Sequence, residues 1–237
     1  MLLAGLGAAL FGVSALLLKA GAPGWDVSLF RILNEVPAAA ASVLTPLSHL
    51  FLPVGIITVV VLTVVYVVAR NRSVLPVATV AAAAGLAWVL AHVAKAVAGR
   101  PRPYEVMADA VLRQQPAHGT SFPSSHTAVT LAVAIAIVPF LARPLAAAGI
   151  AYAVLVGWSR VYLGVHYPLD VLAGAGIGMA AGGVILLALG TLLRCPGRAA
   201  NGHDAVTEAQ ASRADPSPTA VQNSGRSRAS RGRWRRM

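Results

Sequence analysis

Residues 169–193 read LDVLAGAGIGMAAGGVILLALGTLL, a run in which Asp170 is the only ionisable side chain. A transmembrane helix needs about 20 mostly apolar residues, so this stretch is long enough to span a bilayer. Its many glycines and alanines favour close packing against neighbouring helices. An acid at the edge of such a run is costly to bury, which indicates a functional site near Asp170.

Five further apolar stretches precede this one, at approximately 2–18, 45–69, 74–97, 127–142 and 144–163. The first has no positively charged start, and Lys19 follows it, so we expect a retained anchor rather than a cleaved secretion signal. The chain is 57% hydrophobic and 11% charged, which is typical of membrane proteins. The sequence therefore predicts an all-α, polytopic membrane protein with a six-transmembrane-helix bundle.

The C-terminal region has a different composition. Residues 197–237 are rich in Ala, Ser, Pro, Gly and Arg and have no apolar periodicity, a pattern typical of disorder. From Arg194 onward there are nine Arg and three acidic residues, which can bind anionic membrane lipids. No nucleic-acid partner is expected, because the tail contains no folded nucleic-acid-binding motif. We expect two domains: a six-span membrane domain at 1–196 and a disordered, Arg-rich tail at 197–237.

The orientation of the spans follows from the basic residues in the short connections. Those residues fall on one side of the membrane: Arg70, Arg72, Arg143 and the arginines of the tail. The positive-inside rule makes this side the cytoplasm, so both termini are expected to be cytoplasmic in a protein of the cell membrane. The loops at 98–126 and 160–168 then face outward. The outward loop at 19–44 is expected to hold one short interfacial helix, with Trp25 at headgroup level.

Three clusters of charged and hydroxyl-bearing residues lie at the ends of the apolar stretches. They are Lys95-x6-Arg102-Pro103, Pro123-Ser124-Ser125-His126 and Ser159-Arg160-x5-His166-x3-Asp170. In the predicted topology all three reach the outer face. Together they supply cations, two imidazoles, one carboxylate and serine hydroxyls. Such groups can hold a phosphate and stabilise the negative charge of a phosphoryl transition state while a histidine attacks.

The third cluster carries the candidate nucleophile. A spacing of four residues can bring His166 and Asp170 together, so that Asp170 accepts a hydrogen bond from the imidazole Nδ1–H. The Nε2 lone pair is then free to attack. Arg160 can contact phosphate oxygens with its guanidinium fork. Taken alone, this cluster also fits a histidine–aspartate pair that only caps a helix.

The other two clusters supply candidate binding groups and an acid. Ser124 and Ser125 open the fourth span, and free backbone N–H groups at a helix start favour an anion. His126 follows them as a candidate general acid, which simple helix capping does not explain. Lys95 lies near the end of the third span, where interfacial snorkelling is the alternative. Arg102 lies between two prolines that stiffen its backbone.

Other reactive residues have weaker cases. A zinc site built from His126, His166 and Asp170 is disfavoured by the nearby cations, so neither a metal nor another cofactor is expected. Arg100 is expected to be solvated. His92, within a span, is expected to be packed or hydrogen-bonded. The single cysteine of the chain excludes an intramolecular disulfide and a cysteine-built metal cage.

The order and spacing of the three clusters resemble the signature of the type 2 phosphatidic acid phosphatase superfamily of membrane lipid phosphatases. The resemblance implies a metal-independent phosphatase in which His166 forms a phosphohistidine and Asp170 orients it. His126 would protonate the leaving group and then help to activate water. The implied phosphate-binding residues are Lys95, Arg102, Ser124, Ser125 and Arg160. One departure is visible at Ser125, where the family usually has glycine, and the extra hydroxyl is expected to narrow the pocket.

The resemblance also implies a lipid phosphate as substrate. Compact bacterial members are similar to polyprenyl diphosphate phosphatases, which recycle the carrier lipid for cell-wall synthesis. Undecaprenyl or decaprenyl diphosphate is therefore the expected substrate. Phosphatidate and phosphatidylglycerophosphate stay open, as does a non-catalytic protein that binds or transports lipid phosphates. A mere binder would not need both imidazoles. The sequence sets no oligomeric state.

Overall fold

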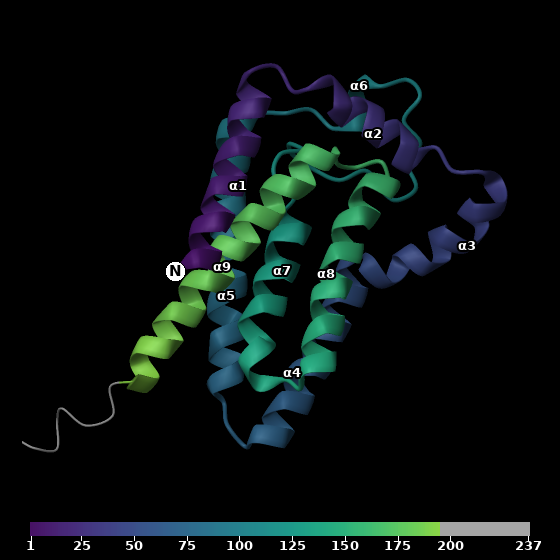
Figure 1. The fold of residues 1–237 in the computed structure, drawn as a ribbon. Helices are drawn as coiled ribbons and strands as arrows, with labels where there is room; N and C mark the ends of the chain where they lie inside the picture. Colours follow the sequence, from purple (N-terminus) through teal and green to yellow (C-terminus); the bar gives the residue numbers. More distant parts are fainter. Residues whose placement is uncertain (195–237) are drawn as a thin grey trace, which may run out of the picture. The chain divides into compact units, whose positions relative to one another are not determined.

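The computed structural model describes residues 1–194, apart from the side chain of His49, and its regular elements there are all helices. They are α1 (Leu2–Lys19), α2 (Gly24–Asn34), α3 (Ala38–Ser48), η1 (His49–Phe51), α4 (Pro53–Asn71), α5 (Leu75–Ala98), α6 (Pro103–Val106), α7 (Ser125–Ile137), η2 (Val138–Phe140), α8 (Arg143–Tyr162) and α9 (Pro168–Arg194). Figure 1 shows α5, α7, α8 and α9 side by side. The predicted tail at 197–237 lies outside the described residues.

The predicted class is confirmed: the chain is an all-α, multi-pass membrane protein. Five helices of the described part, α1, α4, α5, α8 and α9, are long and apolar enough to cross a membrane. The sixth predicted span, 127–142, corresponds to α7 and η2, which form a shorter apolar segment, Ser125–Phe140. A helix this short reaches across less of the hydrocarbon core than its neighbours do.

Two details of the N-terminal half differ from prediction. The predicted span 45–69 begins only at Pro53, because α3 and η1 occupy the residues before it. The 19–44 region holds most of two helices, α2 and α3, rather than one short helix. These two helices bend by 95° at their junction and together are apolar enough to form a broken span.

Prolines and left-handed residues set several helix boundaries. Pro53, Pro76 and Pro144 lie in the first turns of α4, α5 and α8, where a missing N–H costs no intrahelical bond. Helix α4 ends at Arg72 and α5 at Gly99, both with positive φ. The positive φ costs less free energy at Gly99 than at Arg72, because glycine adopts this conformation without a steric penalty. The break at Gly99 releases the chain into the loop that leads to α6.

Glycines of α9 allow its backbone to touch two neighbouring helices. A Cβ added at Gly174 would lie 2.4 Å from the backbone oxygen of Ser124, at the start of α7. A Cβ at Gly176 would lie 2.6 Å from the backbone nitrogen of Phe11 in α1. The close packing expected from the small residues of this span is thus confirmed, and α9 lies beside both α1 and α7.

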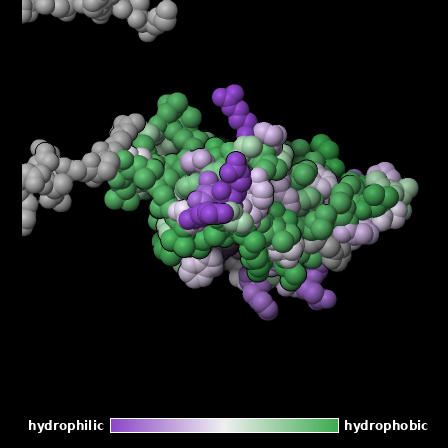
Figure 2. Space-filling view, turned by 90° about the horizontal axis from the view of Figure 1, so that it is seen from below, coloured by the Kyte–Doolittle hydropathy of each residue, from purple (hydrophilic) through white to green (hydrophobic). Residues whose placement is uncertain are grey.

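The outer faces of the helices are apolar, as a bilayer requires. Side chains such as Val61 and Val65 on α4 are 51% and 59% exposed. Figure 2 looks along the helices from below Figure 1, and hydrophobic side chains surround the few hydrophilic ones that project from this end. Hydrocarbon rather than water is the natural surrounding of such faces.

Candidate active site

The ends of four long helices meet at one end of the bundle (Figure 1). A cavity of about 950 Å³ opens there, between the loops that join these helices. Six of the eight predicted site residues line it: Lys95, Arg102, Ser125, His126, Arg160 and His166. The structure therefore brings the three sequence clusters to a single cavity, and both imidazoles belong to its wall.

The remaining two predicted residues, Ser124 and Asp170, lie behind the cavity wall and are fully buried. The Ser124 backbone N–H donates to the Asp170 carbonyl oxygen (2.9 Å), which ties the start of α7 to the start of α9. The Ser124 hydroxyl accepts a hydrogen bond from Thr127 Oγ1 (3.0 Å). Ser124 thus joins two clusters, but the structure does not place its side chain on the cavity surface.

Ser125 is the serine that does face the cavity. Its Oγ is buried and has no hydrogen-bond partner among the described residues. A buried hydroxyl without a partner is uncommon and suits a site that a ligand oxygen completes. Ser125 also stands in the first turn of α7, whose N–H groups have no acceptor within the helix. The start of α7 can therefore donate several hydrogen bonds to an anion.

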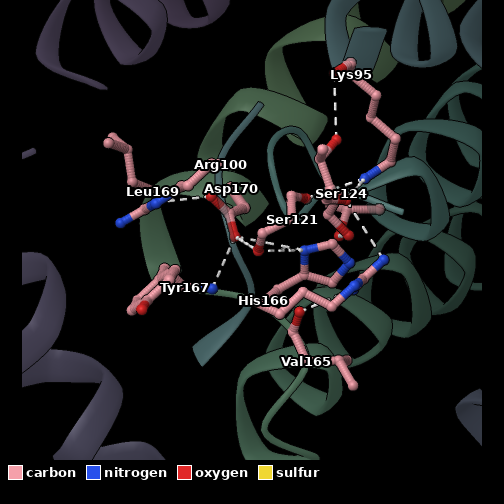
Figure 3. A network of polar contacts seen from close by, with 12 residues as sticks. Lys95, Arg100, Ser121, Ser124, Val165, His166, Tyr167, Leu169 and Asp170 are labelled. Atoms are coloured by element: carbon pink, nitrogen blue, oxygen red, sulfur yellow. Dashed lines mark hydrogen bonds and ion pairs between the residues drawn. The ribbon is translucent and has the colours of Figure 1, made fainter. Parts of the chain in front are cut away.

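His166 lies in the turn between α8 and α9, with Asp170 behind its ring (Figure 3). His166 Nδ1 is 3.4 Å from Asp170 Oδ2, a long contact in which the ring donates. The same carboxylate oxygen accepts the Ser121 hydroxyl and the Tyr167 backbone N–H (2.8 Å). Because these donors fix the carboxylate, it holds the imidazole by Nδ1 and leaves Nε2 as the free nitrogen.

The protonation state of His166 also suits a nucleophile. Burial lowers the pKa of His166 to about 4, while Asp170 opposes the shift and Lys95 and Arg102 add to it. With a pKa this low the imidazole is neutral near pH 7, and only the neutral ring has a lone pair with which to attack.

Arg100, expected to be solvated, is instead buried at 8% exposure, so that expectation was wrong. Its guanidinium bridges two carboxylates: Nη1 donates to Asp170 Oδ1 (2.7 Å) and Nη2 to Asp26 Oδ2 (2.5 Å). It also lies over the Tyr167 ring, 3.8 Å from the ring centroid. Asp26, on α2, accepts the Leu169 backbone N–H (2.7 Å) as well. Both carboxylates are fully buried, and Arg100 is the cation that they share.

Lys95 and Arg102 are anchored by backbone oxygens of the loop before α7 and, for Arg102, also of the turn between α8 and α9. Lys95 Nζ donates to the carbonyls of Thr120 (2.7 Å) and Ser121 (3.0 Å). Arg102 donates to the carbonyls of Gly119 and Val165, each at 2.9 Å. Carbonyl partners fix the position of a cation without neutralising its charge.

Arg160 is held in the same way, with Nη2 donating to the Phe51 carbonyl (2.8 Å). Among the described residues that line the cavity there is no Asp or Glu. Three cations therefore face a space without a balancing carboxylate on its wall. Such a cavity attracts an anion, and a phosphate or diphosphate group carries the matching charge.

His92 and His118 also line the cavity. His92 Nδ1 lies 2.8 Å from the Trp88 carbonyl, one turn back on α5, and its ring packs at a tilt against Trp88 with centroids 4.0 Å apart. The expectation of a hydrogen-bonded His92 is therefore confirmed. His118 contributes its carbonyl as a partner for Arg102 Nη2 (3.0 Å).

Sequence reasoning missed three residues around Asp170: Ser121, Arg100 and Asp26. Ser121 stands two residues before the second cluster and has no distinguishing spacing. Asp26 carried a usable signal, because a lone acid among apolar residues is costly to bury without a partner. A buried Asp26 predicts a buried cation beside it, and the structure shows that this cation is Arg100.

Comparison with known proteins agrees with this arrangement. A family model described as the PAP2 superfamily matches residues 74–194. An undecaprenyl-diphosphatase of Sulfolobus acidocaldarius is 37% identical over 89 residues, which cover 38% of this chain and only 43% of that protein. A putative undecaprenyl-diphosphatase of Escherichia coli, YbjG, is 31% identical over 161 residues, or 65% of this chain and 77% of that protein.

Two solved structures share the fold. The crystal structure of Aquifex aeolicus LpxE superimposes with a TM-score of 0.58 at 29% identity and covers 70% of this chain and 96% of that one. A PAP2 type phosphatidylglycerolphosphate phosphatase from Bacillus subtilis gives a TM-score of 0.58 at 23% identity, covering 81% of this chain and 98% of that one.

Proposed function

The chain belongs to the PAP2 superfamily and is a membrane lipid phosphatase of that family, and from this premise we propose that it hydrolyses a polyprenyl diphosphate of the undecaprenyl or decaprenyl type. The observation that carries the proposal is the single cavity lined by three cations and by the imidazoles of His126 and His166, without an acid among the described residues of its wall. Two relatives named as undecaprenyl-diphosphatases support the choice of lipid.

The size and lining of the cavity support a head group larger than one phosphate. Its volume of about 950 Å³ lies near the upper end of the range for small-molecule sites, about 300–1,000 Å³. Polar side chains line it beyond the proposed phosphate-binding residues, including Gln114 and His118. A second phosphate group would find hydrogen-bonding partners there.

In the proposed reaction the Nε2 lone pair of His166 attacks the terminal phosphorus. The bond between phosphorus and the bridging oxygen breaks, and His126, which the negative charge of the bound diphosphate keeps protonated, gives its proton to that oxygen. Lys95, Arg102 and Arg160, with the hydroxyl of Ser125 and N–H groups from the turn that Ser124 caps, stabilise the charge on the equatorial oxygens.

The second step regenerates the enzyme. His126, now neutral, accepts a proton from a water molecule that attacks the phosphohistidine. The phosphorus–nitrogen bond breaks, inorganic phosphate leaves, and the His166 lone pair is restored. Asp170 keeps the ring of His166 in place through both steps and compensates its positive charge while the intermediate exists.

A substrate panel tests this function. Phosphate release is measured for the purified full-length protein with undecaprenyl diphosphate, undecaprenyl phosphate, phosphatidate and phosphatidylglycerophosphate, each with and without EDTA. We expect the highest kcat/KM for the diphosphate and no effect of EDTA. Release from none of them would favour a non-catalytic binder, and loss of activity in EDTA would favour a metal site. A higher kcat/KM for phosphatidate or phosphatidylglycerophosphate would overturn the choice of lipid but not the phosphatase activity.

We also propose that the cavity faces the outside of the cell membrane and that both termini are cytoplasmic. Basic residues support this orientation: Arg70 and Arg72 lie at the end of α4 and Arg143 at the start of α8, at the end of the helices opposite the cavity (Figure 1). The cations at the other end are accounted for as anion-binding groups.

A reporter fused after residue 237 tests this orientation. Reporter domains that are active on only one side of the membrane are expected to locate this fusion in the cytoplasm. A second fusion in the 107–117 loop, next to the cavity, is expected to lie outside. An extracytoplasmic signal from the C-terminal fusion would contradict the proposed orientation, whatever the lipid substrate.

A further inference from the structure

A second cavity, of about 420 Å³, lies between α4, α7 and α8. Its wall is almost entirely aliphatic and aromatic, with residues such as Val59, Ala134, Leu145 and Gly149. Leu145, on its rim, is 45% exposed and so borders the membrane. This cavity, called here the apolar groove, plays no part in the reaction described above.

The apolar groove adjoins the anion cavity. Thr130 lines both, and on α4 the lining passes from Ile57 in the anion cavity to Val59 in the groove. On α7 the groove continues from Thr130 to Ile137, which at about 1.5 Å per residue is a distance of about 10 Å. The groove therefore leads away from the phosphate-binding end and along the membrane-spanning part of the bundle.

The hydroxyl groups in the groove wall are largely satisfied by the protein itself. Thr130 Oγ1 donates to the His126 carbonyl, Thr63 Oγ1 to the Val59 carbonyl and Tyr152 Oη to the Leu50 carbonyl, each at 2.7 Å. These side chains then need no partner from a ligand. Their remaining surface can border a hydrocarbon chain without leaving a polar group unpaired.

We propose that the apolar groove holds the first part of the hydrocarbon chain of the same lipid whose phosphates occupy the anion cavity. This inference rests on the proposed function and adds a chain-binding subsite to it. A single groove that begins beside the head-group cavity suits one chain, as in a polyprenyl diphosphate. Burying the chain there also fixes the reacting phosphorus relative to His166, since both ends of the lipid are then held.

Gly149 offers a direct test because it lines the groove, and a Cβ built on it meets no atom of the described residues within 4 Å. Gly149→Leu can therefore fill the groove without disturbing the backbone. Gly85→Leu is the matched control. Gly85 lies within α5, a Cβ there also meets nothing within 4 Å, and the residue lines neither cavity. Ala148→Leu, on the same wall as Gly149, serves as a second groove variant.

The experiment compares two substrates with the same head group, a long-chain polyprenyl diphosphate and a short, water-soluble prenyl diphosphate. We expect Gly149→Leu and Ala148→Leu to lower kcat/KM for the long chain by about tenfold or more, as for other pockets that lose room for part of a ligand. Turnover of the short substrate should stay within a few-fold of the parent protein. Gly85→Leu should leave kcat/KM for both substrates unchanged.

Each other outcome has a defined meaning. Equal loss with both substrates, or no difference between the groove variants and Gly85→Leu, would overturn the chain-binding subsite and leave ordinary membrane lipid as the occupant of the groove. That result would not contradict the proposed phosphatase activity. If the parent protein releases phosphate from neither substrate, the proposed function itself fails, and the two failures are thus distinguishable.

Discussion

Replacing His166 with alanine is expected to abolish phosphate release while leaving the protein folded in the membrane. The variant removes the proposed nucleophile, and loss of a nucleophile that acts with its partners as a unit costs at least about 10³-fold in kcat. The side chain is almost fully buried, yet it reaches the cavity wall, so alanine there enlarges an existing cavity and breaks no ion pair with a fixed charge. Turnover of undecaprenyl diphosphate by purified protein is the measurement.

His92→Ala is the matched control for this experiment. His92 lines the same cavity, but its ring packs against Trp88 and its Nδ1 bonds to a carbonyl of its own helix. Its removal is expected to change turnover by no more than a few-fold. Near-normal activity of His166→Ala would exclude His166 as the nucleophile. If the His166→Ala protein does not accumulate in the membrane, turnover is measured on His166→Asn instead. This variant keeps a polar side chain of similar size near Asp170.

Arg100→Ala is expected to be the most destabilising substitution near the site. It would leave Asp26 and Asp170 buried, close together and without their common cation. Removing one partner of a buried ion pair typically costs about 3–5 kcal/mol. Turnover should fall as well, because Asp170 would lose one of the donors that fix it behind His166. Thermal unfolding of the detergent-purified protein and its kcat are the two measurements.

A surface ion pair on the same helix as Asp26 provides the comparison. Arg31 and Asp109 are joined at 2.6 Å, but their side chains are 51% and 42% exposed. Exposed pairs contribute little, so Arg31→Ala should leave the unfolding temperature nearly unchanged. Arg100→Lys keeps the charge but cannot contact both carboxylates with a planar guanidinium, so its unfolding temperature should lie between those of Arg100→Ala and the parent protein. Equal behaviour of Arg100→Ala and Arg31→Ala would show that the bridge to Asp170 is not important.

The spans were largely predictable because each depends on local composition. Long apolar runs identified α1, α5, α8 and α9 to within a residue or two. The start of α4 was predicted eight residues too early, because Leu50, Phe51 and Leu52 extend the apolar run upstream of Pro53. Composition also gave no warning that α2 and α3 would bend by 95°. That bend depends on what the two helices pack against, which a local pattern does not contain.

The convergence of the three clusters was predictable for a related reason. Once the helix count was set, Lys95, His126 and His166 had to reach the same end of the bundle. The finer roles were not accessible, because they depend on contacts between distant segments. Arg100 and Arg102 are two residues apart in a basic, proline-rich loop. Only the fold shows that Arg102 lines the cavity while Arg100 turns to Asp170.

The backbone contact between α9 and α7 at Gly174 has a consequence for how the enzyme meets its substrate. Where helices touch without intervening side chains, there are no rotamers to readjust, and sliding or tilting would meet hard repulsion at once. Because His166 stands two residues before α9 and His126 lies in the first turn of α7, this contact limits how far the two imidazoles can move apart. We therefore expect the two imidazoles to be held near their working positions before a lipid arrives.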